Sequence, residues 1–201
     1  MSHAFPFRGL RVLDLGQGVA SPYCAMLLAL YGADVIKVEP PEGDWSRGLG
    51  AKLASGAHTP MSLTFNRGKR ALRLDLKRPE ARAILRSLAL KADVLVEGFR
   101  PGVAARLGVG YDSLAAENPK LIYLSVSGFG QSGPNAQRPV TDTAAQAFSG
   151  FMDTNRGPDG VPHRSGALAA DVPTGLYAYA AIATALFARQ QTGTGRHIDV
   201  S

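Results

Sequence analysis

The sequence predicts an α/β protein built on a Rossmann-like, doubly wound and mainly parallel sheet. Short apolar runs typical of buried strands alternate with segments of helical periodicity along most of the 201 residues. Glycine-bearing loops follow the ends of several of these runs, where open α/β sheets bind ligands. The composition, 45% hydrophobic and 19% charged, is that of a globular domain with one substantial core.

In the first half of the chain, we expect strands at 11–16 and 34–39, separated by a helix over 21–33. Ser21 and Pro22 are typical of a helix start, and Gly32 of its end. Residues 40–59 are polar and glycine-bearing, and we assign them no element. The segment RALRLDL at 70–76 alternates strictly, which predicts a half-exposed strand with Leu72, Leu74 and Leu76 on one face.

The second half continues the alternation. We expect helices at 79–91, 103–108 and 111–118, a helix beginning near Asp142, and strands at 93–98, 121–128 and 197–200. Strands joined in this way by helices imply parallel pairing with right-handed crossovers. The long loops at 129–140 and 153–166 are expected to border a binding site.

The N-terminus lacks the charged and apolar pattern of a signal peptide, and a single cysteine excludes an internal disulfide, so we expect a cytoplasmic protein. The uncharged run between Asp171 and Arg189 approaches the length needed to span a membrane. It contains Pro173, Gly175 and many alanines, which favours a buried helix and no membrane partner.

The formal net charge of +6 comes from one region. Residues 67–86 hold eight Lys or Arg against two acids, while the rest of the chain is balanced. A local basic cluster favours a compact polyanion, such as a nucleotide phosphate, over a nucleic acid partner. The alternative is a solvated helix face, because Arg78, Arg82 and Arg86 recur at helical spacing.

Gly16, Gly18 and Ser21 follow the first strand in a pattern close to the dinucleotide-binding fingerprint, and Glu39 stands where the acid that binds a ribose is expected. The third glycine is missing, however, and Pro22 removes a backbone donor where a pyrophosphate needs one. A tight turn without dinucleotide binding is the competing interpretation. The four histidines show no metal-ligand spacing, so we expect no metal site.

Asp171 is an acid isolated among small and apolar residues, and two hypotheses account for it. Placed before Val172 and Pro173, its side chain is suited to cap a long helix. The same position suits a nucleophile, since a helix N-terminus stabilises a carboxylate that is stripped of water. Local pattern does not decide between the two.

Several segments together resemble the family III CoA-transferases, a group that includes formyl-CoA and carnitine CoA-transferases and the α-methylacyl-CoA racemases. They are GADVIKVEPPEGDWSRG, FNRGKRALRLDLKRPEA, KADVLVEGFRPGVAARLG, SVSGFGQSGP and GALAADVPTGLYAYAAIATALFARQQTGTGRHIDVS. The resemblance implies that residues 1–180 are the N-terminal part of a CoA-binding large domain. Residues 181–201 would then be a helix and the start of a linker toward a smaller domain that this chain lacks.

The resemblance also implies a reaction. Asp171 would attack an acyl-CoA thioester to give an aspartyl acyl anhydride, and CoA thiolate would return to form an aspartyl-CoA thioester that the acceptor carboxylate takes over. Acyl-CoA and a carboxylic acid are the implied partners, with no permanent cofactor, and relatives are interlinked homodimers. The residues expected to bind CoA are Val19, Ala20, Leu74, Asp75, Leu76, Lys77, Gly98, Phe99, Arg100, Arg106 and Asp142.

Some positions depart from the family pattern. Val19 replaces a glutamine and Pro139 a lysine of the formyl-CoA enzyme, which argues against an oxalate-type substrate. Thr141 occupies the place of the catalytic histidine of the racemases, and a threonine cannot act as a base at neutral pH. Transferase is therefore favoured, with a racemase, a dinucleotide-binding domain and a CoA-binding fragment without activity as alternatives.

Overall fold

The computed structural model describes residues 5–201 and contains one six-stranded sheet in the order β3-β2-β1-β4-β5-β6. All five strand pairs are parallel, which confirms the predicted architecture. The strands are β1 (Arg11–Asp14), β2 (Asp34–Glu39), β3 (Arg70–Arg73), β4 (Val94–Glu97), β5 (Ile122–Val126) and β6 (Arg196–Val200). The order reverses between β1 and β4, and ligands bind at such switch points in open α/β sheets.

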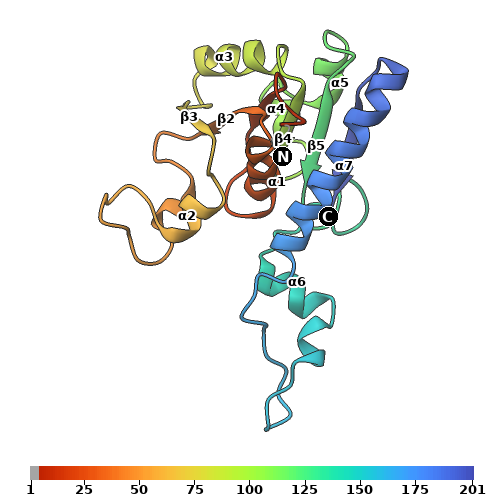
Figure 1. Ribbon diagram of the computed structural model, residues 1–201. Coiled ribbons are helices and arrows are strands. Elements are labelled where there is room, and N and C mark those ends of the chain that lie inside the picture. The colour runs from red at the N-terminus through yellow and green to blue at the C-terminus, as the bar shows by residue number, and fades with distance from the viewer. Residues whose placement is uncertain (1–4) are drawn as a thin grey trace.

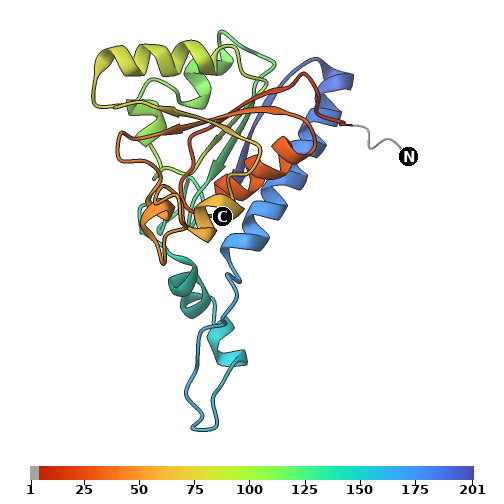
Figure 2. The same ribbon diagram turned by 60° about the vertical axis from the view of Figure 1, so that its left-hand side comes forward.

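Helices cover both faces of the sheet, which Figure 2 shows between the two helix layers. On one side lie α1 (Ala20–Leu30) and α7 (Asp171–Thr192), which pack against each other. On the other side lie α3 (Pro79–Ala89), α4 (Val103–Arg106) and α5 (Tyr111–Ala115). A smaller unit, α6 (Asp142–Phe148) followed by the 3-10 helix η2 (Phe151–Thr154), extends away from the sheet beyond the start of α7 (Figure 1).

Two cores follow from the alternation of side chains along the strands. Val96 and Leu124 face α1 and α7, where they meet Cys24 and Ile182. Leu95 and Tyr123, which precede them in sequence, face α3 and α5 and pack in the second core. Both faces are buried, so the strands read as nearly continuous apolar runs. Burial also raises the pKa of the Cys24 thiol.

The beginnings of α1 and α7 touch at Gly175. A Cβ atom at this position would lie 2.7 Å from the carbonyl oxygen of Ala20 and 2.9 Å from Cδ1 of Tyr23. Only glycine allows the two backbones to approach so closely. This contact sets where the first turn of α7, and with it Asp171, lies relative to the loop after β1.

The structure differs from the sequence-based expectations in the segment after β2. A 3-10 helix, η1 (Trp45–Gly48), and a short helix, α2 (Pro60–Thr64), form where no element was predicted. Both depend on side-chain caps: Asp44 accepts the N–H of Ser46, and Thr59 forms a capping box with Ser62. These helices are too short for hydrophobic periodicity to indicate them.

The strand predicted over 70–76 ends at Arg73, because the chain turns at 75–78, where the N–H of Arg78 donates to the carbonyl oxygen of Asp75. Leu74 and Leu76 nevertheless pack on the core as the alternation suggested. The domain division at residue 180 stays a prediction, since a smaller domain would lie outside this chain; within it, α7 continues past residue 180 and β6 pairs with β5. None of the helices within residues 5–201 has the length and apolar character to cross a membrane.

We expect Gly175→Ala to lower the free energy of unfolding by about 2 kcal/mol, because the added methyl group overpacks the α1–α7 contact. Thr184→Ala, on an exposed position of the same helix, is the control and should change stability by less than about 0.5 kcal/mol. Chemical denaturation checks both, and equal stability of the two variants would contradict the close approach.

Candidate active site

Asp171 is the first residue of α7, and its side chain does not cap the helix. The N-cap position belongs to Ala170, which has no side-chain cap hydrogen bond. The hypothesis that Asp171 is a capping residue is therefore wrong. Its carboxylate is left to face a cavity, as the alternative hypothesis requires.

The capping group comes from α6 instead. Oδ1 of the buried Asp142 accepts the N–H of Ala170 at 2.7 Å and the N–H of Asp171 at 3.0 Å. Its other oxygen, Oδ2, accepts a bond of 2.6 Å from Nε2 of Gln146. Asp142 thus occupies the donors at the start of α7 and fixes the backbone that carries Asp171. The preceding residue, Thr141, caps α6 by accepting the N–H of Ala144.

The environment of Asp171 makes its carboxylate more basic than usual. Burial, and then the negative charge of Asp142, raise the pKa of Asp171 to about 6. The group is therefore ionised at neutral pH but poorly solvated. A carboxylate in this state is a better nucleophile than one in water.

Asp171 lines a cavity of about 330 Å³ at the carboxyl ends of the strands, which we call the Asp171 cavity. The loops after β1, β2, β4 and β5 all contribute to its walls. Besides Asp171, four of the predicted CoA-binding positions line it: Val19, Ala20, Gly98 and Asp142. Gln17, Trp45 and Ser127 also line it, although the sequence pattern had not pointed to them.

A second cavity of about 330 Å³, the Leu74 cavity, shares Gln17 with the first. Five further predicted positions line it: Leu74, Asp75, Leu76, Lys77 and Phe99. Its walls are largely apolar, with Lys77 as the basic side chain among its lining residues. The two cavities are therefore neighbours that share Gln17 as a wall residue.

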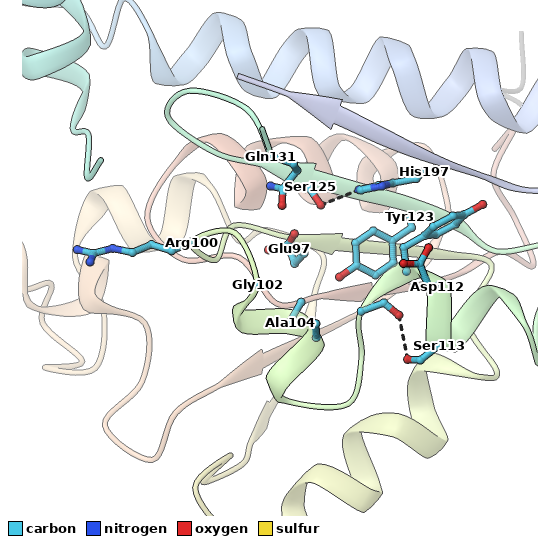
Figure 3. A pocket seen from close by; sticks show the side chains of 13 residues that line it. Glu97, Arg100, Gly102, Ala104, Asp112, Ser113, Tyr123, Ser125, Gln131 and His197 are labelled. Carbon is cyan, nitrogen blue, oxygen red and sulfur yellow. Dashed lines mark hydrogen bonds between the residues drawn. The ribbon is translucent and has the colours of Figure 1, made fainter. Parts of the chain in front are cut away.

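Arg100 lines a third cavity, of about 270 Å³, which we call the Glu97 cavity, and no other predicted CoA-binding residue is among the residues that line it. Figure 3 shows its side chain extending away from the polar groups of this Glu97 cavity. Among these groups, Ser125 and His197 are hydrogen-bonded at 2.9 Å, and burial raises the pKa of Glu97. Arg106 is exposed on α4 and is not among the residues that line the three cavities.

The basic cluster at 67–86 is partly used within the fold. The ammonium of Lys69 is buried 2.8 Å from Asp14, and Arg70 pairs with Asp34 at the surface. Arg86 is not simply a solvated residue, since it binds Glu117 and, at 2.7 Å, the carbonyl oxygen of Gly108. Of the cluster, Lys77 is the cation that reaches the Leu74 cavity.

The geometry does not favour dinucleotide binding. Arg47 engages both carboxylate oxygens of Glu39, at 2.9 and 2.7 Å, so this acid is not free for a ribose. The ring of Trp45 lies over Gly18, where an added Cβ would be 2.2 Å from Cζ2. The glycines thus allow a tight turn beneath an aromatic ring.

Comparison with known proteins decides the family. Residues 7–201 match the model of CoA-transferase family III. The chain belongs to this family.

Within residues 5–201, no group of three or more His, Cys, Asp or Glu side chains gathers in a way that could hold a metal ion.

Individual members of CoA-transferase family III are similar over nearly the whole chain. The chain is 47% identical to acetyl-CoA:oxalate CoA-transferase of Acetobacter aceti and 43% identical to succinate–glutarate CoA-transferase of Agrobacterium fabrum. Each alignment covers 98% of this chain and 50% of the relative. The crystal structure of a CaiB/BaiF family protein from Brucella suis superposes with a TM-score of 0.88 at 41% identity, over 98% of this chain and 53% of that one. The chain therefore spans about half the length of the relatives that it matches.

We expect Asp171→Asn to stabilise the fold at pH 7.5. The raised pKa means that the folded protein binds a proton between pH 6 and 4 that the unfolded chain does not, so this carboxylate destabilises the fold at neutral pH. After allowance for solvent screening, the gain is about 1 kcal/mol, and it should vanish below pH 4. Thermal unfolding at both pH values measures it. Glu42→Gln, on an exposed position, is the control, and an equal gain at both pH values would contradict the prediction.

Proposed function

We propose that this chain is the N-terminal part of an enzyme that moves CoA from an acyl-CoA donor to a carboxylic acid, with Asp171 as nucleophile. One observation carries the proposal. A poorly solvated carboxylate with a raised pKa stands at the start of a helix and lines a cavity beside a second, mostly apolar cavity. Membership in CoA-transferase family III supports it.

CoA would bind with its nucleotide end in the Leu74 cavity and its thiol end at Asp171. The apolar walls suit an adenine ring, and Lys77 offers a charge to a phosphate. The pantetheine arm would pass Gln17, where the two cavities meet. Arg100 and Arg106 remain predicted CoA-binding residues that would have to reach CoA from outside these two cavities.

The transfer proceeds through acyl exchange on the carboxylate. Asp171 attacks the thioester carbonyl, the C–S bond breaks, and CoA leaves as thiolate, which gives an aspartyl acyl anhydride. The thiolate then attacks the aspartyl carbonyl and releases the donor carboxylate, which leaves an aspartyl-CoA thioester. The acceptor carboxylate displaces the thiolate, and the thiolate attacks the acceptor's acyl carbon to regenerate Asp171. No net proton transfer is needed, so a raised carboxylate basicity and a fixed geometry are the main requirements.

Racemisation of an acyl-CoA is the alternative activity within the same group of enzymes, and the structural role of Thr141 argues against it. Racemisation requires a base on the far side of the α carbon, whereas the Thr141 hydroxyl oxygen is engaged as the cap of α6. The resemblance further supports an interlinked homodimer for the whole protein, and the single cysteine of these 201 residues supports a cytoplasmic location. Both the acceptor acid and the homodimer form part of this proposal.

Incubation of the full-length protein with acyl-CoA should give a mass adduct on the peptide that carries Asp171. Asp171→Ala should lose the adduct and lower the turnover number by at least about four orders of magnitude, because Asp142, the other carboxylate that lines the cavity, is engaged by the α7 N–H groups and by Gln146 and cannot replace the nucleophile. Asp142→Asn, which keeps an oxygen for the α7 N–H groups, is the control and should still form the adduct. Normal turnover by Asp171→Ala would contradict the mechanism.

The rate should also depend on the ionisation of Asp171. Since the protonated carboxyl group cannot attack, we expect kcat/KM to fall about tenfold per pH unit below an apparent pKa near 6. Asp142→Asn removes the neighbouring negative charge and should move the midpoint to lower pH. A midpoint that does not move in this variant would assign the titration to the substrate instead.

A further inference from the structure

A network of four buried charges lies beneath the loop that follows β1. Lys37 on β2 is 1% exposed, and its ammonium lies 2.9 Å from Oδ2 of Asp44 and 3.7 Å from Oδ2 of Asp14. Lys69 lies 2.8 Å from the same oxygen of Asp14. Two ammonium groups and two carboxylates thus balance each other within the fold.

Lys37 and its partners hold the backbone of the Gly16–Gly18 loop at three points. Nζ of Lys37 donates to the carbonyl oxygen of Gly16 at 2.6 Å, and the N–H of Gly16 donates to Oδ1 of Asp14 at 2.9 Å. The N–H of Gly18 donates to both oxygens of Asp44, at 3.1 and 3.2 Å. Both peptide groups that flank Gln17 are therefore fixed.

The same carboxylate fixes a second loop. Oδ1 of Asp44 also accepts the N–H of Ser46 at 2.8 Å, which begins η1 and orients Trp45. The ring of Trp45 lies against Gly18 and lines the Asp171 cavity together with Gln17. Lys37, through Asp44, thus joins the loops after β1 and β2 into one wall of the cavity.

Burial of four charges is not needed for stability. Desolvation costs offset much of the attraction in a buried ion pair, and apolar residues of similar size can stabilise a core equally well. What charged hydrogen bonds provide is a single geometry for the groups that they join. In this network, those groups are the loops that border both ligand cavities.

We propose that Lys37 is a positioning residue for CoA transfer: by holding Gly16 and Asp44, it keeps Gln17 and Trp45 in place at the junction of the Leu74 and Asp171 cavities. This inference rests on the proposed function. It assigns Lys37 no contact with the substrate. The Lys37 ammonium acts through the backbone of Gly16 and through Asp44, which holds the loop that carries Trp45.

Lys37→Met in the full-length protein tests the proposal. The change keeps an unbranched side chain that is one atom shorter but frees both loops, so we expect KM for acyl-CoA to rise at least tenfold and kcat/KM to fall by more than that. Trp45 is the single tryptophan of these 201 residues, and its emission in the full-length protein is obtained by subtracting the spectrum of a Trp45→Phe variant. This emission should shift to longer wavelength, and its response to added CoA should weaken. Lys69→Met is the matched control, because it removes a buried ammonium of the same network that contacts neither Gly16 nor Asp44. It should lower the melting temperature while it leaves KM within twofold of wild type.

The outcomes separate this inference from the proposed function. A wild-type protein without an adduct at Asp171 would overturn the CoA-transfer proposal and this inference with it. A wild-type adduct, together with a folded Lys37→Met variant whose KM and Trp45 emission are unchanged, would overturn the positioning role alone. Equal effects of the two lysine variants on KM would do the same.

If Lys37→Met fails to fold, the Asp44→Asn variant tests the positioning role instead. It keeps an oxygen for the N–H of Gly18 but removes the charge that holds Lys37, and it should raise KM and shift the emission in the same directions. An unchanged KM in this variant, or failure of both variants to fold, would overturn a positioning role that is separable from stability.

Discussion

The carboxylate of Asp142 is the constraint on which the site depends. Its Oδ1 accepts the first free N–H groups of α7, and its Oδ2 is held by Gln146 one turn further along α6. Asp142 therefore connects α6, in the unit that extends away from the sheet, with α7, the helix that carries Asp171. It also places a negative charge beside that residue, so the group that fixes the position of Asp171 contributes to its basicity.

The parallel sheet explains why residues far apart in the sequence share the two cavities. All six strands end at the same edge, and the loops that follow them meet there. Near the switch point between β1 and β4, Gln17 borders both cavities, and Gly98 and Phe99 are distributed between them. Under the proposed function, neighbours in sequence would serve different parts of one extended ligand, a molecule with a nucleotide at one end and a thiol at the other.

The sequence predicted the sheet and the start of α7 well because both depend on local signals. Apolar runs define β1, β4 and β5, and Asp171 followed by a proline marks a helix start. One of the two hypotheses for Asp171 made it the cap of α7, whereas the capping carboxylate belongs to Asp142, which lies 28 residues before Ala170. Trp45 was missed for a similar reason: η1 forms through the side chain of Asp44, and no periodic pattern reports a single capped turn. Lys37 lies at a buried position of β2 between Ile36 and Val38, and only its spatial partners explain a charge at that position.

The burial of Cys24 has a practical consequence for the chemistry of thiols. Its side chain is fully covered in α1, and the raised pKa keeps it as the unreactive thiol at neutral pH. A reagent that reports free CoA through its sulfhydryl group would therefore find no competing signal from this part of the native protein. Mixed disulfides with CoA, a common side reaction of exposed cysteines, have no accessible sulfur here to form on.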